Sequence, residues 1–143
     1  MNAEQLANAI LDGEDPKAFL KQKSSEYQQR REMAQTFIDA YIDAALWSSS
    51  DDEGPLDRFD ADDIDIATKG QMVDDCISFY FDNYDMISDD PEQAGHDFWL
   101  TRNHHGAGFW DGDWENGDEL TKAAHAYGSY DLWVGIDDKI HGA

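Results

Sequence analysis

The side chains most able to do chemistry gather between residues 96 and 111. Imidazole and carboxylate groups are common ligands of transition metals, and a pair such as Asp97 with His105 could exchange a proton with a substrate. Neither the HxH nor the HExxH spacing of a metal site occurs here. We therefore expect no catalytic residue, metal or cofactor, and favour a structural or partner-contact role in which Asp97 orients a hairpin and pairs with Arg102. The group comprises His96, Asp97, Arg102, His104, His105 and Asp111.

Two other kinds of site have weak support in the sequence. Residues 111–117 begin like the calcium loop of an EF-hand, but the glycine comes one place late and the twelfth position is Lys122 rather than Glu. The chain has no phosphate-binding glycine loop, no GxSxG and no Cys–His nucleophile signature. The His and Asp group described above still leaves a small enzyme or metal site on residues 96–111 as an alternative.

Acidic side chains dominate the composition. The 143 residues include 32 Asp and Glu against 10 Lys and Arg, which gives a formal net charge of −22. Residues 51–100 alone hold 16 acids and 2 bases. This balance disfavours direct binding to nucleic acid or to an anionic membrane, and it favours a basic protein or a cation as partner. Apolar residues, at 41%, are too frequent for a disordered acidic tail.

The single cysteine, Cys76, excludes an internal disulfide and a multi-cysteine zinc site. It lies in an apolar helical stretch, so we expect a buried thiol. No apolar run is long enough to span a membrane, and the N-terminus lacks the basic and apolar regions of a secretory signal. We expect a cytoplasmic location.

Helical periodicity organises the first half of the chain. Residues 3–11 predict a short amphipathic helix, and Asp15 followed by Pro16 predicts a new helix start that leads into a basic segment at 16–23. Apolar residues recur at helical spacing from 25 to 48, which predicts a long helix. We expect residues 1–23 to form an N-terminal helical arm and residues 24–143 a single acidic domain.

A second long helix is predicted over residues 67–88, after an acidic loop at 48–66. At about 100° per residue, Val73 and Cys76 lie on an apolar face that continues to Ile87, and aspartates occupy the other side. Carboxylates held in this way on folded helices form the predicted partner-binding surface. Its residues are Asp74, Asp75, Asp82, Asp85, Asp89, Asp90 and Glu92.

Strand-like patterns follow Pro91. Residues 98–101 and 109–110 predict a hairpin that turns at the glycines of 106–108. Residues 117–127 predict a helix that stops at Gly128, and residues 130–136 and 139–141 predict further strands. The aromatic side chains of this half are expected to form the core of the sheet. The predicted fold is α+β, with a helical N-terminal half packed with a small antiparallel sheet and one helix in the C-terminal half.

Residues 94–111 read AGHDFWLTRNHHGAGFWD. This stretch resembles a family of small acidic proteins of bacteriophages and related mobile elements, whose pattern is AGHDFWLTRN, a glycine and then HGAGFWD. Here His104 stands in place of that glycine. Residues 40–47 (AYIDAALW) and 126–140 (AYGSYDLWVGIDDKI) resemble two accompanying patterns, so the resemblance covers about residues 33–141. It implies a phage context and brings no known activity. The motif positions singled out are His96, Asp97, Trp99, Arg102, Asn103, His105, Gly106, Gly108, Trp110 and Asp111.

Charge and phage context together predict a function by binding. We expect a DNA-mimic-like inhibitor that occupies the basic site of a host nucleic-acid-handling or defence protein in the cytoplasm of the infected bacterium, because a rigid array of carboxylates imitates the field of DNA phosphates. No direct contact with nucleic acid or membrane is expected. The sequence is compatible with both a monomer and a homodimer. The alternatives are a small enzyme or metal-binding domain on the 96–111 hairpin and an accessory phage protein whose charge serves only solubility.

Overall fold

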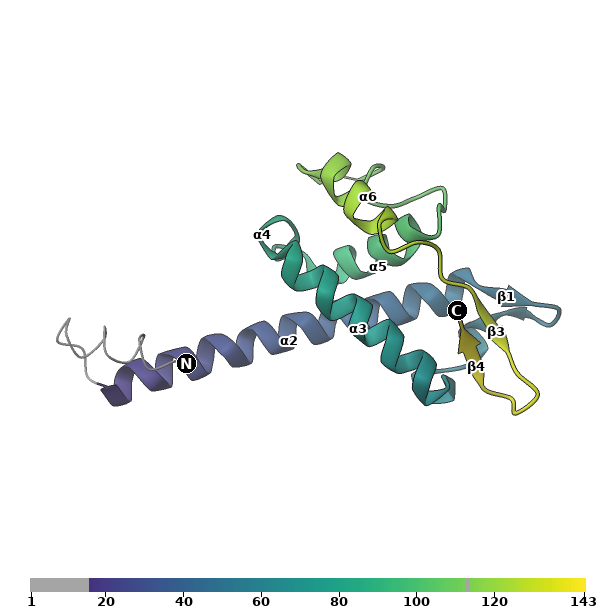
Figure 1. Ribbon diagram of the computed structural model, residues 1–143, viewed down its shortest axis with the longest axis horizontal. Helices are drawn as coiled ribbons and strands as arrows, with labels where there is room; N and C mark the ends of the chain where they lie inside the picture. Colours follow the sequence, from purple (N-terminus) through teal and green to yellow (C-terminus); the bar gives the residue numbers. More distant parts are fainter. Residues whose placement is uncertain (1–15, 113) are drawn as a thin grey trace. The chain divides into compact units, whose positions relative to one another are not determined.

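The computed structural model describes residues 16–112 and 114–143, with side chains from residue 25 onward. It has the α+β composition that the sequence predicts, with helices in both halves and two small antiparallel sheets (Figure 1). In chain order the elements are α2 (Pro16–Ser48), β1 (Ser50–Asp51), β2 (Gly54–Pro55), the 3-10 turns η1 (Leu56–Arg58) and η2 (Ala61–Asp63), α3 (Ile66–Asp82), α4 (Tyr84–Ile87), α5 (Pro91–Arg102), α6 (Gly117–His125), β3 (Leu132–Val134) and β4 (Ile140–Gly142).

The chain divides into two compact units, residues 1–33 and 34–143. In the first unit the described backbone is helical from Pro16, the predicted first helical residue. The helix predicted over residues 25–48 extends back to Pro16 as part of α2, and no Gly or Pro occurs between residues 17 and 48 to interrupt it. The predicted helix at 3–11 and Asp15 lie outside the described residues, and the predicted arm boundary at residue 23 stays a prediction.

The second unit is built around a cluster of buried rings. In Figure 1, α3 crosses the C-terminal half of α2, and the ring of Phe37 on α2 lies 6.0 Å from that of Phe79 on α3. Phe98 on α5 stacks on Phe79 with ring centroids 4.1 Å apart and an interplanar angle of 12°. Phe109, from the loop after α5, adds a fourth ring 5.7 Å from Phe79. Each such pair contributes about 0.5–1.5 kcal/mol beyond the burial of its area.

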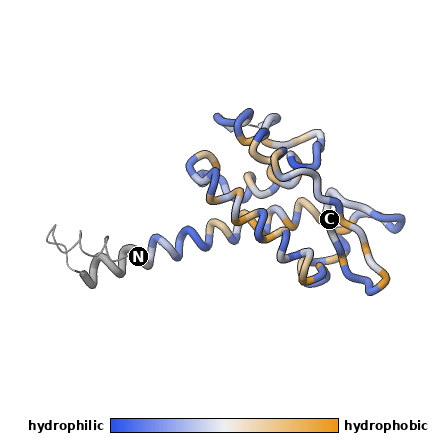
Figure 2. Tube along the Cα trace, viewed as in Figure 1, coloured by the Kyte–Doolittle hydropathy of each residue, from blue (hydrophilic) through white to orange (hydrophobic). Residues whose placement is uncertain are grey.

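Hydropathy along α2 follows this packing. The trace is hydrophilic over residues 25–32 and becomes more hydrophobic toward 37–46 (Figure 2). Phe37, Tyr41, Ala44 and Ala45 have no measurable exposure in the second unit. The apolar stripe that predicted the helix is therefore the face of α2 that meets the core.

α5 corrects the sequence prediction most clearly. Residues 98–101 are helical and do not form a strand, so the predicted hairpin over 96–111 is wrong, and residues 103–112 and 114–116 belong to a loop between α5 and α6. Asp90 caps the helix by accepting a hydrogen bond from the backbone N–H of Gln93, and Pro91 occupies its first turn. The helix carries buried residues on nearly every side, which removes the periodic signal of an amphipathic helix.

The aromatic residues of the C-terminal half therefore pack among helices and do not form the core of a sheet. Phe98, Trp99 and Phe109 are at most 2% exposed, whereas Trp110 and Trp133 are 53% and 48% exposed. The aromatic content of this half thus indicated a core without indicating which elements build it.

The predicted helix over 67–88 is two helices, separated at Asn83. The Asn83 side chain donates to the carbonyl oxygen of Phe79 and ends α3. The buried face of α3 carries Met72, Cys76 and Phe79 and is rotated by about 90° from the predicted face, at about 100° per residue. Cys76 is buried, as predicted, and burial raises the pKa of its thiol.

Two hairpins complete the fold. β1 pairs with β2, and β3 pairs with β4 in an antiparallel register that places Trp133 opposite His141. The strand predicted over 130–136 is confirmed in shorter form, and the one predicted over 139–141 is confirmed one residue later. A bridge between Ile64 and Ile140 joins β4 to the segment before α3. Across residues 16–112 and 114–143, no helix combines the length and apolar character that crossing a membrane requires.

Gly95 and Gly70 offer a matched test of the packing. A Cβ at Gly95 would collide with the backbone carbonyl of Phe37, whereas a Cβ at Gly70 would meet nothing within 4 Å. We expect Gly95→Ala to lower the free energy of unfolding by about 2 kcal/mol and Gly70→Ala to raise it by about 0.5–1 kcal/mol. Urea unfolding of both variants checks this, and equal effects would contradict the close approach of α5 to α2.

Candidate functional site

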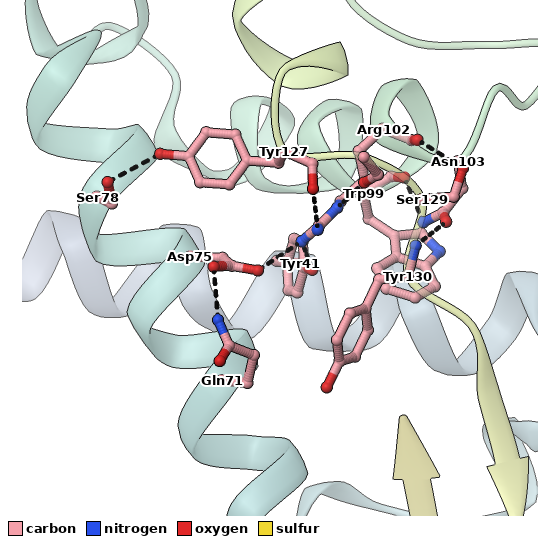
Figure 3. A network of polar contacts seen from close by, with 11 residues as sticks. Tyr41, Gln71, Asp75, Ser78, Trp99, Arg102, Asn103, Tyr127, Ser129 and Tyr130 are labelled. Carbon is pink, nitrogen blue, oxygen red and sulfur yellow. Dashed lines mark hydrogen bonds and ion pairs between the residues drawn. The ribbon is translucent and has the colours of Figure 1, made fainter. Parts of the chain in front are cut away.

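Arg102 is the centre of the polar interior. Its Nε donates to the carbonyl oxygen of Gly128 at 2.9 Å, and its Nη2 donates to that of Tyr127 at 3.2 Å. Its Nη1 donates to the Tyr41 hydroxyl at 3.0 Å and to Asp75 Oδ2 at 2.9 Å. Figure 3 shows these groups converging on the guanidinium from α2, α3 and the segment after α6. One side chain therefore ties together four parts of the second unit.

Asp75 is thereby separated from the rest of the predicted partner-binding surface. Its side chain is 16% exposed and forms an ion pair with Arg102, whose side chain is 3% exposed. Gln71 donates to its other oxygen at 2.9 Å. The predicted pairing of Arg102 with Asp97 is wrong, because α5 is a helix and directs the two side chains to different partners.

The motif residues at the end of α5 serve its termination. The Nδ2 of Asn103 donates to the carbonyl oxygen of Trp99, and its Oδ1 accepts from the backbone N–H of Tyr130. His104 follows in the left-handed conformation with φ of 57°. The backbone N–H groups of His104 and His105 donate to Thr101 and Leu100, which is the Schellman pattern of a helix end. The position at which the resembled pattern has glycine is thus one that favours glycine.

The remaining motif residues are divided between interior and surface. Trp99 is buried and donates from Nε1 to the Ser48 hydroxyl at 2.8 Å. Gly108 has φ of 155°, and a Cβ there would collide with the Thr101 hydroxyl, which accepts from the N–H of Phe109. The other positions do not converge on a common centre. His96 is half-buried, and His105, Gly106, Trp110 and Asp111 are exposed.

The other six acids of the predicted surface are exposed. They lie on or beside three consecutive helices, α3, α4 and α5. No ion pair joins them to Lys or Arg among the side chains of residues 25–112 and 114–143. They are Asp74, Asp82, Asp85, Asp89, Asp90 and Glu92.

A hollow of about 660 Å³ joins this acidic surface to the motif. α4 and the turn after it form one wall, the first half of α5 forms another, and loop residues from 107–112 and 114–116 form the third. Met86, Ala107 and Trp114 supply its apolar parts. Its carboxylates are Asp85, Asp89, Asp90, Asp97, Asp111 and Glu115.

Asp97 is the buried carboxylate of the hollow, with 4% of its surface exposed. Its Oδ1 accepts from Gln93 Nε2 at 3.0 Å and its Oδ2 from Trp114 Nε1 at 2.7 Å. Burial raises the pKa of Asp97, against the opposing effect of these two donors and of His96. The carboxyl group therefore pays a desolvation cost to remain ionised at neutral pH.

The hollow does not have the form of a metal centre. Within the described part of the chain, no group of three or more His, Cys, Asp or Glu side chains comes together as a metal ion requires. The carboxylates are instead spaced around the walls. Such an arrangement suits an extended cationic group with several donors.

Trp114 and Gln93 were not predicted as site residues. Gln93 stands four places before Asp97, a spacing that brings two side chains together on a helix but not on a strand. A correct helix assignment for 91–102 would have indicated this pair. No local pattern indicates Trp114, because its partner is 17 residues away.

Comparison of the chain with protein-family models, with curated proteins and with solved structures finds no match.

Replacement of Arg102 by lysine tests the central network. Lysine keeps the charge but cannot reach the Tyr41 hydroxyl, Asp75 and two carbonyl oxygens at once, so buried acceptors lose their donors. We expect Arg102→Lys to lower the free energy of unfolding by about 3 kcal/mol. Arg58→Lys, at an exposed arginine paired with Asp51, is the matched control. We expect it to leave the midpoint of urea unfolding nearly unchanged, and equal losses would contradict the role assigned to Arg102.

Asp97→Asn tests the cost of the buried carboxylate. The pKa of Asp97 is higher in the folded protein than in the unfolded chain. The free energy of unfolding therefore falls as pH rises from the unfolded-state pKa to the folded-state pKa. Asparagine removes the titrating group, so we expect the stability of the variant to change less than that of the parent protein between about pH 4, near the ordinary carboxyl range, and about pH 7. Unfolding in urea at several pH values measures this, with exposed Asp52→Asn as the control for charge loss. An equal change with pH in the variant and in the parent protein would contradict the raised pKa of Asp97.

Proposed function

We propose that this protein acts by binding, as a DNA-mimic-like inhibitor that occupies the basic site of a host nucleic-acid-handling or defence protein, in the bacteriophage context that its motif implies. The observation that carries the proposal is the set of six exposed carboxylates on α3, α4 and α5, which have no cationic partner among the described side chains. Exposed acids without partners leave their field directed at solvent and at any basic surface nearby.

Rigidity supports this function over charge alone. Duplex DNA carries about one charge per 1.7 Å of its axis, whereas Asp74 and Asp82 are separated by about 12 Å along α3 at 1.5 Å per residue. The carboxylates of one helix are therefore too far apart to match the charge spacing of DNA. The acids of α4 and α5 must add to those of α3, and their positions relative to α3 must be fixed. The buried rings and the Arg102–Asp75 pair hold α3 and α5 in such a relation.

The alternative of a small enzyme on residues 96–111 has less support. Asp97 is hydrogen-bonded to Gln93 and Trp114, and no hydrogen bond joins it to His105 in the described part of the chain. Arg102 and Asn103 are occupied in holding the fold. The alternative of an accessory phage protein whose charge serves solubility is separated from inhibition by the experiment below.

Capture from bacterial lysate followed by competition with DNA tests the proposal. The immobilised protein is exposed to lysate at about 50 mM and about 500 mM salt, a range over which screening of exposed charges increases strongly. We expect nucleic-acid-handling proteins to be retained only at the lower salt. Each purified captured protein is then expected to release labelled duplex DNA when this protein is added, as measured by fluorescence anisotropy.

A charge-neutralised variant provides the control for the same experiment. It replaces Asp74, Asp82, Asp85, Asp89 and Asp90 with Asn and Glu92 with Gln, and we expect it to lose capture and competition. Asn can also cap a helix, so α5 should keep its start. Capture of no nucleic-acid-handling protein at either salt, or equal competition by the variant, would contradict the proposed function and leave the solubility interpretation.

A further inference from the structure

The hollow between α4, α5 and the loop residues of 107–112 and 114–116 has the size of a binding site. Its volume of about 660 Å³ lies within the range of about 300–1,000 Å³ of typical ligand sites. Its walls combine six carboxylates with Met86, Ala107 and the ring of Trp114. No Lys or Arg lines it among the described residues. Such a lining is complementary to a side chain that is cationic at its tip and apolar along its stem.

Asp97 gives the hollow a fixed anionic floor. Gln93 and Trp114 each donate one hydrogen bond to it, one to each oxygen. A carboxylate has room for about four hydrogen bonds, so each oxygen can accept another from a ligand. Because the carboxylate is buried and each oxygen already accepts one hydrogen bond, it is held in place before a ligand arrives.

Trp114 gives the hollow an aromatic wall in a fixed orientation. Its indole N–H is held by Asp97, and its ring meets that of Phe109 edge to face, with centroids 5.7 Å apart and an angle of 69°. A ring fixed at both places can stack with a planar cation. Guanidinium is planar and donates in pairs to carboxylates, whereas ammonium is a compact point charge.

We propose that the hollow receives an arginine side chain from a basic segment of the partner protein, an inference that rests on the proposed function. The guanidinium lies against the Trp114 ring and donates toward Asp97, Asp85 and Asp89, while its aliphatic stem passes the apolar wall. The exposed acids outside the hollow attract the partner, and the hollow selects arginine over lysine.

Binding of short peptides to the full chain tests this inference. Tetra-arginine and tetra-lysine peptides of equal charge are titrated by calorimetry, and the indole N–H signals of the 5 tryptophans are followed by NMR. Absence of one signal in Trp114→Phe assigns the Trp114 resonance. We expect tetra-arginine to bind about threefold or more tighter than tetra-lysine and to shift the Trp114 signal.

Two variants with the same charge change locate the binding. Asp85→Asn with Asp89→Asn removes two acids that line the hollow, and Asp74→Asn with Asp82→Asn removes two exposed acids outside it. We expect the first pair to weaken tetra-arginine binding by about tenfold and the second by less than about twofold. Equal weakening by both pairs, equal affinity for the two peptides, or an unmoved Trp114 signal would overturn the inference.

The two proposals fail in different ways. If tetra-arginine enters the hollow but lysate yields no nucleic-acid-handling protein, the proposed function fails and the arginine site stands. If such proteins are captured and displaced from DNA but the peptide experiment shows only diffuse attraction, the proposed function stands and the arginine site is overturned.

Discussion

The desolvated guanidinium of Arg102 is the constraint on which the second unit depends. A charged group this deeply buried is tolerated only when its donors and its charge are all matched. Asp75 supplies the charge, and the Tyr41 hydroxyl and two main-chain carbonyl oxygens supply the remaining acceptors. Burial raises the pKa of the Tyr41 phenol, so the hydroxyl stays neutral beside the guanidinium. α2, α3, α5 and the segment after α6 must therefore meet at one point with little freedom.

This constraint links the interior to the surface. An isolated helix loses about 0.2–0.5 kcal/mol for each pair of like charges three or four places apart, and here the acids crowd onto α3, α4 and α5. Ring stacking of Phe79 on Phe98 and the pair of Asp75 with Arg102 join α3 to α5 on the inner side. The outer side can then carry exposed carboxylates, of which Asp90 also caps α5. Asp75 separates these two roles. In the sequence it lies among the acids of the predicted surface, but in the structure it pairs with Arg102 in the interior.

Sequence periodicity could predict the elements that present one apolar face. The C-terminal half of α2 was recognisable for this reason. α6 and the last hairpin were predicted from a helix stop at Gly128 and from aromatic and β-branched composition. α5 was not, because residues 97–102 are buried on all sides and the run Phe98-Trp99-Leu100 carries strand-like composition without alternation. Of the candidate site, the sequence predicted the exposed acids but neither the Arg102 network nor the hollow. Exposed acids follow from composition, but the partners of Arg102 lie 27 and 61 residues away, and the hollow exists only once α5 and the loop after it are placed.

The position of two Arg102 acceptors along the chain bears on how the protein is made. The carbonyl oxygens of Tyr127 and Gly128 belong to a segment that the ribosome delivers after all the helices. A growing chain that folded before these residues were synthesised would leave the Nε and one Nη2 donor of Arg102 without their carbonyl acceptors. Domains commonly fold as units during synthesis, and the interior around Arg102 is expected to be completed only after Gly128 has left the ribosome.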